Sequence, residues 1–330
     1  MVDAVLIVLV FASIILSFAI GTNDETFAPV VGVKRLSVRS AVIIGAVVAI
    51  FGAFLLAPKV SDTLNNDISS IQISNEIVLI ISVFVSMALC LILASIFGLP
   101  ISSTEAMVGS ILGLTIARGE KIIWSWEGMG HIFFTWAVSP ILGFIGSLLL
   151  MKLMNKILSR KVKGLSGLET SNAISGSLLL VWVIIAGFSR AGNDISNAIA
   201  PIYPLFQNNE ASIFYQRIPM LLGGAGLGLG LIIIGWRVLK SLGNDVVELT
   251  PESAFVTQAS SALITLIATI LGIPVSGTMI LVASFIGAGY GSKKSVNFKS
   301  VRTIVLFIFL TPLISGSFAV AFYYLLRGVF

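Results

Sequence analysis

Cysteine, histidine and charged side chains are scarce in this chain of 330 residues, which has one cysteine, one histidine and 11% charged residues. The single cysteine, Cys90, excludes a disulfide within the chain. So few nucleophiles, bases and metal ligands leave no convincing catalytic set, and we predict that the protein is not an enzyme. With 57% hydrophobic residues, the composition also excludes an ordinary soluble globular protein.

Long apolar runs occupy most of the sequence. Each run lacks the alternation of a β-strand and approaches the roughly 20 residues that a helix needs to cross a bilayer. The predicted membrane-crossing helices are 2–20, 40–57, 77–97, 131–151, 254–271 and 303–326, with shorter ones at 173–188 and 220–236. Two further runs, 101–117 and 275–290, are predicted to be broken or re-entrant helices at Pro-Ser-Thr motifs. The predicted fold class is an all-α integral membrane protein.

Lysine and arginine gather in four clusters, at residues 34–39, 152–163, 237–240 and 293–302. Basic loops favour the cytoplasmic side of a membrane, and one topology puts all four clusters there. In this topology each half has about five crossing segments, both termini are extracytoplasmic, and the second half is inverted relative to the first. We therefore predict a multi-pass protein of the cell (plasma or inner) membrane, in contact with the lipid bilayer and without a nucleic-acid partner. The predicted repeats are 1–165 and 166–330, forming one unit with a site between them.

Two polar motifs interrupt the apolar sequence, and each occurs twice, in the same order and at nearly the same spacing. Asn23-Asp24 recurs as Asn193-Asp194. The sequence Gly-Leu-Pro-Ile-Ser-Ser-Thr at 98–104 recurs as Gly-Ile-Pro-Val-Ser-Gly-Thr at 272–278. Polar segments interrupted by Gly and Pro at corresponding positions of two halves indicate the central binding site of a transporter.

The Asn-Asp pairs are candidate sodium ligands. A carboxylate at membrane depth is costly and usually faces a cavity or a partner. Each pair offers an anionic and a neutral oxygen, which small hard cations prefer, and carbonyls of an unwound helix would add further ligands. The predicted metal (sodium) ligands are Asn23, Asp24, Asn193, Asp194 and Gln258. A proton relay and two interfacial helix caps are the alternative roles of the aspartates, and Gln258 also suits a bridge between helices.

The Pro-hydroxyl runs are candidate anion sites. Pro is favoured in the first turn of a helix and Ser or Thr at its cap, so each run predicts a break followed by a new helix start. Free amides and the positive end of the helix dipole bind anions there, and glycine permits close approach. Two such starts facing one another would suit a small tetrahedral oxyanion, whereas two ordinary capped helices are the structural alternative. The predicted anion-binding residues are Ser102, Ser103, Thr104, Ser276, Gly277 and Thr278.

Further polar residues near these motifs are secondary candidates for coupling: Glu25, Glu105, Arg190, Asn197 and Ser260. Glu25 and Glu105 follow the motifs and act either as coupling carboxylates or as water-facing groups. For Arg190 we predict an ion pair with Asp194, with contact to the anion as the alternative.

These motifs resemble those of the inorganic phosphate transporter (Pit) family, the sodium- or proton-coupled phosphate symporters. The family's duplicated signature is similar to residues 18–24 and 188–198, and its Gly-Leu-Pro-Val-Ser-Thr-Thr run is similar to 98–104 and 272–278. The stretch from Gly235 to Pro251 also resembles sequences of this family, and the resemblance covers nearly the whole chain. It implies an inverted-repeat fold, a homodimer, and transport of orthophosphate by alternating access.

Several positions depart from the family pattern. Many members have His where this chain has Glu105, Met279 and Arg190, and many have a Glu near Phe51 and another near Gln258. Fewer titratable groups inside the membrane favour sodium over proton coupling.

The predicted function is a secondary-active sodium:inorganic phosphate symporter that imports phosphate into the cytoplasm. At least two sodium ions are expected, because a divalent phosphate needs two monovalent cations for neutrality, and no organic cofactor is expected. A proton-coupled phosphate symporter and a sulfate permease of the same fold are the alternatives. A passive anion channel and a membrane-embedded phosphatase are the rivals from other classes.

Overall fold

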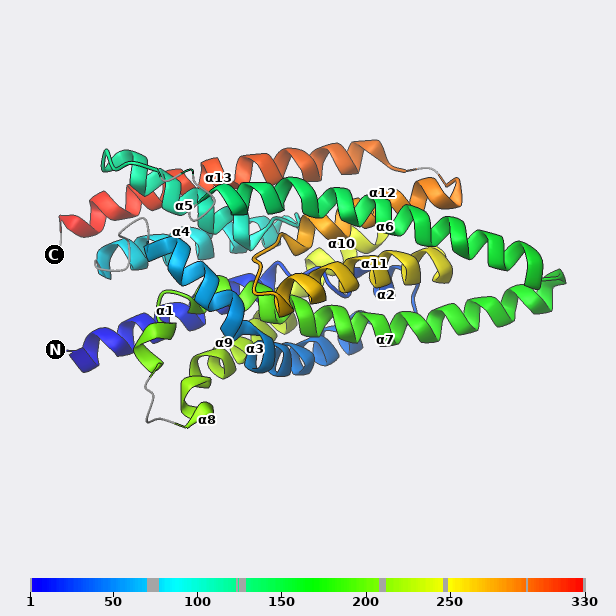
Figure 1. Ribbon diagram of the computed structural model, residues 1–330, viewed down its shortest axis with the longest axis horizontal. Coiled ribbons are helices and arrows are strands. Elements are labelled where there is room, and N and C mark those ends of the chain that lie inside the picture. The colour runs from blue at the N-terminus through cyan, green and yellow to red at the C-terminus, as the bar shows by residue number, and fades with distance from the viewer. Residues whose placement is uncertain are drawn as a thin grey trace.

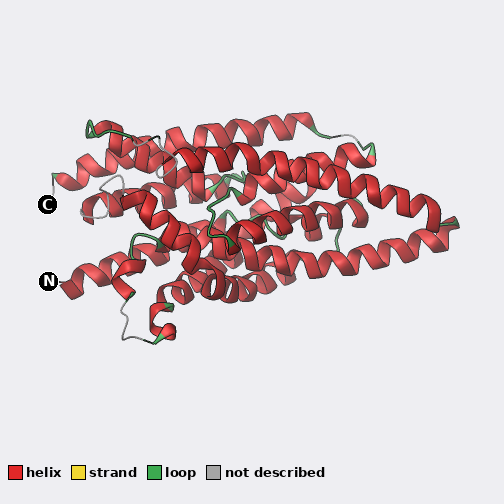
Figure 2. Cartoon of the chain, viewed as in Figure 1, coloured by secondary structure: helices red, strands yellow, loops and turns green. Residues whose placement is uncertain are grey.

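In a computed structural model of the chain, the described residues are 2–69, 77–122, 124, 129–207, 212–245, 249–294 and 296–328. This described part consists of helices and their connections, with no β-strand, and most of the helices run along one long axis (Figure 1, Figure 2). The predicted all-α class is thereby confirmed. Continuous helices satisfy their own backbone hydrogen bonds, which is what an apolar, membrane-embedded chain requires.

The helices are α1 (Val2–Thr22), α2 (Ala28–Gly32), α3 (Val38–Ser69), α4 (Ile77–Ile96), α5 (Ser103–Ala117), α6 (His131–Lys161), α7 (Gly164–Ile199), η3 (Tyr203–Phe206), α8 (Ile213–Gln216), α9 (Ile218–Gly230), η4 (Leu231–Gly235), α10 (Trp236–Asp245), α11 (Pro251–Ile270), α12 (Gly277–Ser292) and α13 (Phe298–Arg327). Within the described residues, eight helical segments are long and apolar enough to cross a membrane. The apolar helices α5 and α12 are shorter, with 15 and 16 residues.

Several helices extend beyond the apolar runs that predict them. The run 131–151 belongs to α6, which continues to Lys161, and the run 173–188 is the middle of α7, which spans Gly164–Ile199. The run 220–236 is divided among α9, the π-helical turn η4 and α10. Hydropathy marks the part of a helix that suits lipid, whereas the backbone hydrogen bonds continue into polar sequence at either end.

The two predicted breaks are present and are built alike. Gly98 and Gly272 follow α4 and α11 with φ of +67° and +77°, a left-handed conformation that glycine adopts without strain. Ser102 and Ser276 are the N-caps of α5 and α12, and their hydroxyls accept the amides of residues 105 and 279.

The expected position of proline at these breaks is wrong in detail. Pro100 and Pro274 lie in the non-helical connections, two residues before the N-caps, and not in the first helical turn. An N-cap needs extended backbone, and the hydroxyl-bearing Ser takes that place at both breaks, so proline stiffens the approach to the helix.

Helices from the two halves are interleaved. The hairpin of α4 and α5 opens toward one end of the molecule and that of α11 and α12 toward the other, while both chain termini lie at one end (Figure 1). Helix α5 packs against α13, and α12 packs against α6. A Cβ on Gly109 of α5 would lie 2.3 Å from Cα of Pro312 in α13, so this crossing is at backbone contact. Hairpins that open to opposite ends are what an inverted repeat predicts, and the repeat boundary near residue 165 stays a prediction.

Candidate ion and anion site

Each break is held by the asparagine of the Asn-Asp pair in the same half of the chain. The Asn23 carboxamide donates to the Leu99 carbonyl at 3.0 Å and accepts the Ile101 amide at 2.8 Å. The Asn193 carboxamide donates to the Ile273 carbonyl at 3.0 Å and accepts the Val275 amide at 3.1 Å.

The second donor contact of each asparagine is matched as well. Asn23 donates to the Ser95 hydroxyl at 2.8 Å, and Asn193 donates to the Thr269 hydroxyl at 3.2 Å. These bonds satisfy backbone groups that a broken helix would otherwise leave without partners in an apolar environment. Both asparagines are therefore structural clamps on the breaks, a role that the motif sequence alone does not reveal.

The two Asn-Asp pairs sit on different backbone. Helix α1 ends at Thr22, so Asn23 and Asp24 lie in a non-helical segment. Helix α7 continues to Ile199, so Asn193 and Asp194 lie on intact helix. The expectation of an unwound helix beside each pair therefore holds only for the first half. In that half, the Asp24 carboxylate accepts the amide and the hydroxyl of Thr26, which fold the connection back upon itself.

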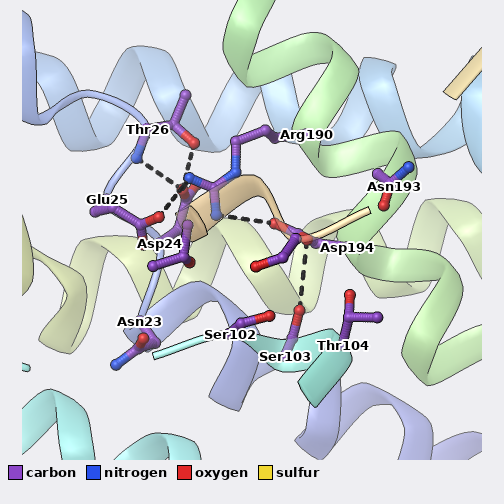
Figure 3. Close-up of polar contacts among 12 residues, drawn as sticks. Asn23, Asp24, Glu25, Thr26, Ser102, Ser103, Thr104, Arg190, Asn193 and Asp194 are labelled. Carbon is purple, nitrogen blue, oxygen red and sulfur yellow. Dashed lines mark hydrogen bonds and ion pairs between the residues drawn. The ribbon is translucent and has the colours of Figure 1, made fainter. Parts of the chain in front are cut away.

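One guanidinium joins the two pairs. Arg190 is buried, at 5% exposed, and its Nη1 lies 2.6 Å from Oε1 of Glu25 and 4.0 Å from Oδ1 of Asp24 (Figure 3). Its Nη2 lies 3.4 Å from Oδ2 of Asp194, so the predicted Arg190–Asp194 ion pair is present. Glu25, one of the secondary candidates, provides the shortest contact and is completely buried. Three carboxylates thus share one cation, and when all are ionised the cluster carries an excess of two negative charges.

The two new helix starts face one another. The Thr104 hydroxyl donates to the Val275 carbonyl at 3.4 Å, and the Thr278 hydroxyl donates to the Ile101 carbonyl at 3.4 Å. The contacts are reciprocal, since each threonine is on one helix start and its acceptor on the connection to the other. The helix N-termini of α5 and α12 therefore converge, as the anion-site prediction requires, and their first amides are not consumed by the helices themselves.

A small polar cavity lies where the helix starts meet the charged cluster. Its lining comprises Ile20, Asn23, Asp24, Leu91, Ile101, Ser102, Ser103, Arg190, Asp194, Gly277 and Thr278. Most of the predicted cation ligands and most of the predicted anion donors therefore line one cavity. Asn193 is directed away from it, toward its break.

Ser103 and Asn197 connect the first helix start to α7. The Ser103 hydroxyl donates to the Asp194 carboxylate at 3.4 Å, and the Asn197 amide donates to the Ser103 hydroxyl at 3.3 Å (Figure 3 shows the first contact). Asn197 also reaches the Thr104 hydroxyl at 3.5 Å. Asn197 thus positions the hydroxyls of the anion candidates and connects them to the aspartate.

Three further candidates lie around this centre. Glu105 is buried on α5, its amide is held by the Ser102 hydroxyl, and its carboxyl faces the Ser276 hydroxyl. Gln258 is buried on α11, and among the described residues no hydrogen bond joins it to either Asn-Asp pair. Ser260 donates to the Gly143 carbonyl of α6 at 3.4 Å, which puts it in a helix–helix contact and away from the carboxylate cluster.

Helices broken around a buried, charged cavity are characteristic of secondary transporters. The model of the phosphate transporter family matches residues 20–321 of the chain. The chain belongs to this family, and it is a multi-pass membrane protein.

The names of relatives agree with this assignment, and a solved structure has the same fold. The chain is 27% identical to a protein of Chlamydia pneumoniae over 95% of this chain and 96% of the relative. It is 26% identical to a protein of Thermococcus kodakarensis over 94% of each chain. Both relatives bear the name "Putative phosphate permease". A solved structure named "The sodium-dependent phosphate transporter" superposes with a TM-score of 0.80 at 21% identity, over 99% of this chain and 100% of that one, and shows the same fold.

Proposed function

We propose that the protein is a secondary-active symporter that imports inorganic phosphate with sodium by alternating access. One observation carries the proposal: two converging helix N-termini line the same buried cavity as Arg190 and two of its three carboxylate partners, Asp24 and Asp194. Amides at helix starts bind anions, and carboxylates bind small hard cations, so this cavity suits an anion and cations together. The family supports phosphate as the anion, and the sodium dependence named for the structural neighbour supports sodium as the cation.

The ligands follow from this arrangement. Phosphate would bind at the two helix starts, through Ser102, Ser103, Thr104, Ser276, Gly277 and Thr278. Sodium ions would bind at Asp24 and Asp194, with the oxygen of Asn23 as a further ligand at the cavity and the oxygen of Asn193 as one at its break. Each asparagine oxygen accepts one amide and keeps a second lone pair. Gln258, which is buried on α11 with its Oε1 unpartnered within the described residues, stays a proposed sodium ligand.

Charge sets the expected stoichiometry. The cluster of Arg190 with Asp24, Glu25 and Asp194 carries an excess of two negative charges when ionised. A phosphate dianion cannot enter a buried negative cavity without cations, because the two would repel strongly at low dielectric. We therefore expect at least two sodium ions for each phosphate, and a third would make transport electrogenic.

Uptake of labelled phosphate into proteoliposomes tests the proposal. An inward sodium gradient is compared with an equal gradient of choline, and each condition is repeated with a sodium ionophore and with protein-free liposomes. Concentrative uptake that needs sodium and is abolished by the ionophore supports symport. Conductance without concentrative uptake would instead identify a passive channel.

Two further conditions separate the alternatives within the fold. Uptake that continues in choline and follows a pH gradient would make the coupling ion a proton. Strong inhibition by excess sulfate, together with uptake of labelled sulfate, would make the anion sulfate. We further propose a homodimer in the cell membrane with extracytoplasmic termini. Cysteine labelling of the termini from either side would check the orientation.

A further inference from the structure

Arg190 is a charged residue of the cavity that has no charged counterpart in the first half. The position that corresponds to it in the first half is Ile20, three residues before Asn23, and it lines the same cavity without a charge. Glu25, which makes the shortest contact with Arg190, corresponds in turn to Ile195. The ion pair between Arg190 and Glu25 therefore exists once in a site whose backbone is built twice.

The guanidinium lies between the two kinds of ligand. Two of its nitrogens, Nη1 and Nη2, face the carboxylates of Glu25, Asp24 and Asp194. Its Nε is buried and makes no hydrogen bond within the described part of the chain. This edge lies against the first residue of α12, where a Cβ added to Gly277 would be 2.4 Å from Nε. Arg190 thus has an unused donor directed at a helix N-terminus that suits an anion.

The carboxylates limit what Arg190 can do in the empty site. Three negative groups surround its one positive charge, so an arriving phosphate meets net repulsion although the guanidinium is adjacent. Cations bound at these carboxylates would remove the repulsion and weaken their hold on the guanidinium. A planar guanidinium released in this way would offer paired donors to phosphate oxygens beside the amides of α12.

We infer that Arg190 is a phosphate-binding residue that couples the two substrates, being held by Glu25, Asp24 and Asp194 in the empty site and released to phosphate when sodium binds these carboxylates. Sodium therefore binds before phosphate. This inference rests on the sodium:phosphate symport proposed above, and it adds the order of binding and the residue that enforces it.

Binding measurements on the purified full-length protein test the inference. Sodium binding without phosphate is measured by calorimetry in choline buffer, and binding of labelled phosphate is measured at several sodium concentrations. The wild type is expected to bind sodium alone, but phosphate only when sodium is present. Equal phosphate affinity in choline and in sodium would overturn the order.

The variant Arg190→Gln separates coupling from a structural role. Without the guanidinium the carboxylates lose their competing cation, so sodium should bind more tightly, by about tenfold, while phosphate affinity falls by about tenfold or more. Arg190→Lys keeps the charge but loses the planar fork, so it should regain part of the phosphate affinity. If Arg190 has only a structural role, Arg190→Gln should instead weaken the binding of sodium and of phosphate together, and that result would overturn the inference.

Arg217→Gln is the matched control, because Arg217 donates to the Phe54 carbonyl and lies over the Phe54 ring, outside the lining of the cavity. It should leave both affinities unchanged. If Arg190→Gln does not fold, the wild-type order and the Arg190→Lys shifts still decide the inference. Failure of wild-type proteoliposomes to take up phosphate with sodium would reject the proposed function. Normal wild-type uptake combined with unaltered phosphate affinity in Arg190→Gln would reject the inference about Arg190 and leave the proposed function standing.

Discussion

The two duplicated motifs have the same scaffold but different chemistry. Asn23 and Asn193 clamp their breaks through matching hydrogen bonds, with lengths of 2.8, 3.0 and 2.8 Å in the first half against 3.2, 3.0 and 3.1 Å in the second. In contrast, the cation Arg190 belongs to the second motif only, and so does continuous helix through the Asn-Asp pair. The comparison shows that the geometry of the breaks is the same in both halves, whereas the cation of the cavity comes from the second half alone.

The largest effect is expected from the aspartates, because they carry the charge of the cation site. Asp194→Asn should reduce sodium-driven phosphate uptake by about a hundredfold, since a buried carboxylate that contacts both Arg190 and Ser103 is lost. Asp24→Asn should cost less, about tenfold, because Asp24 is 4.0 Å from Arg190 and is more exposed. Initial rates in proteoliposomes measure both.

Each aspartate variant needs a check that the protein still inserts and folds, for which the elution profile in detergent and the thermal midpoint suffice. Wild-type uptake in both variants would contradict the sodium-site assignment. Equal losses in the two variants would contradict the difference between the two motifs.

The next effect comes from exchanging the helix-start residues between the halves. Gly277→Ser copies Ser103 into α12, and its Cβ would lie 2.4 Å from Nε of Arg190. The guanidinium is tied to buried carboxylates, so it cannot move away cheaply, and we expect the KM for phosphate to rise about tenfold. Ser103→Gly removes the 3.4 Å hydrogen bond to Asp194 and the 3.3 Å hydrogen bond from Asn197, and a change of about threefold is expected. An unchanged KM in Gly277→Ser would show that this edge of Arg190 is remote from bound phosphate.

Substitutions of the two asparagine clamps test whether the two breaks are equivalent. Asn23→Ala and Asn193→Ala should each destabilise the protein by about 1–3 kcal/mol, because the amides of Ile101 and Val275 are left without their partners. Thermal midpoints measured in one detergent should fall by similar amounts. A clearly larger loss for one variant would break the equivalence of the two breaks.

The smallest effect is expected at Ser260, which lies in the contact between α11 and α6 and outside the lining of the cavity. Ser260→Ala removes only a long hydrogen bond to Gly143 on α6, so stability should change by about 0.5 kcal/mol or less. Neither the sodium nor the phosphate dependence of uptake should move. An altered sodium dependence of uptake would instead show that Ser260 takes part in coupling.

The sequence was sufficient to predict the helical class, the breaks and the residues around them. Long apolar runs leave a membrane-embedded chain few alternatives to helices, and Gly-x-Pro followed by a capping Ser indicates a break and a restart on local grounds. The ion pair of Arg190 with Asp194 was also predicted, because a lone cation beside a buried carboxylate is rarely left unpaired.

Contacts between segments distant in sequence could not be predicted in this way. That Asn23 bonds the connection at Leu99, that Glu25 takes the shortest contact with Arg190, and that Ser260 faces α6 all depend on packing. The matched recurrence of Asn with the Gly-x-Pro breaks was the available signal for the clamps, since it pairs one amide side chain with each break. The helical continuity of α7 through Asn193 carries no such signal, because a glycine lies close before the pair in both halves, Gly192 one residue before Asn193 and Gly21 two residues before Asn23.

The exchange of helix partners between the halves has a consequence for how the chain is made. Helix α5 completes its packing only against α13, where the hydroxyls of Ser110 and Ser315 form a hydrogen bond across a separation of 205 residues. Membrane helices insert one by one as the ribosome synthesises them, and side-by-side packing follows. The first half must therefore remain in the bilayer inserted but incompletely packed until α13 arrives. Biogenesis of the cavity is therefore a late event, which waits for the insertion of α13.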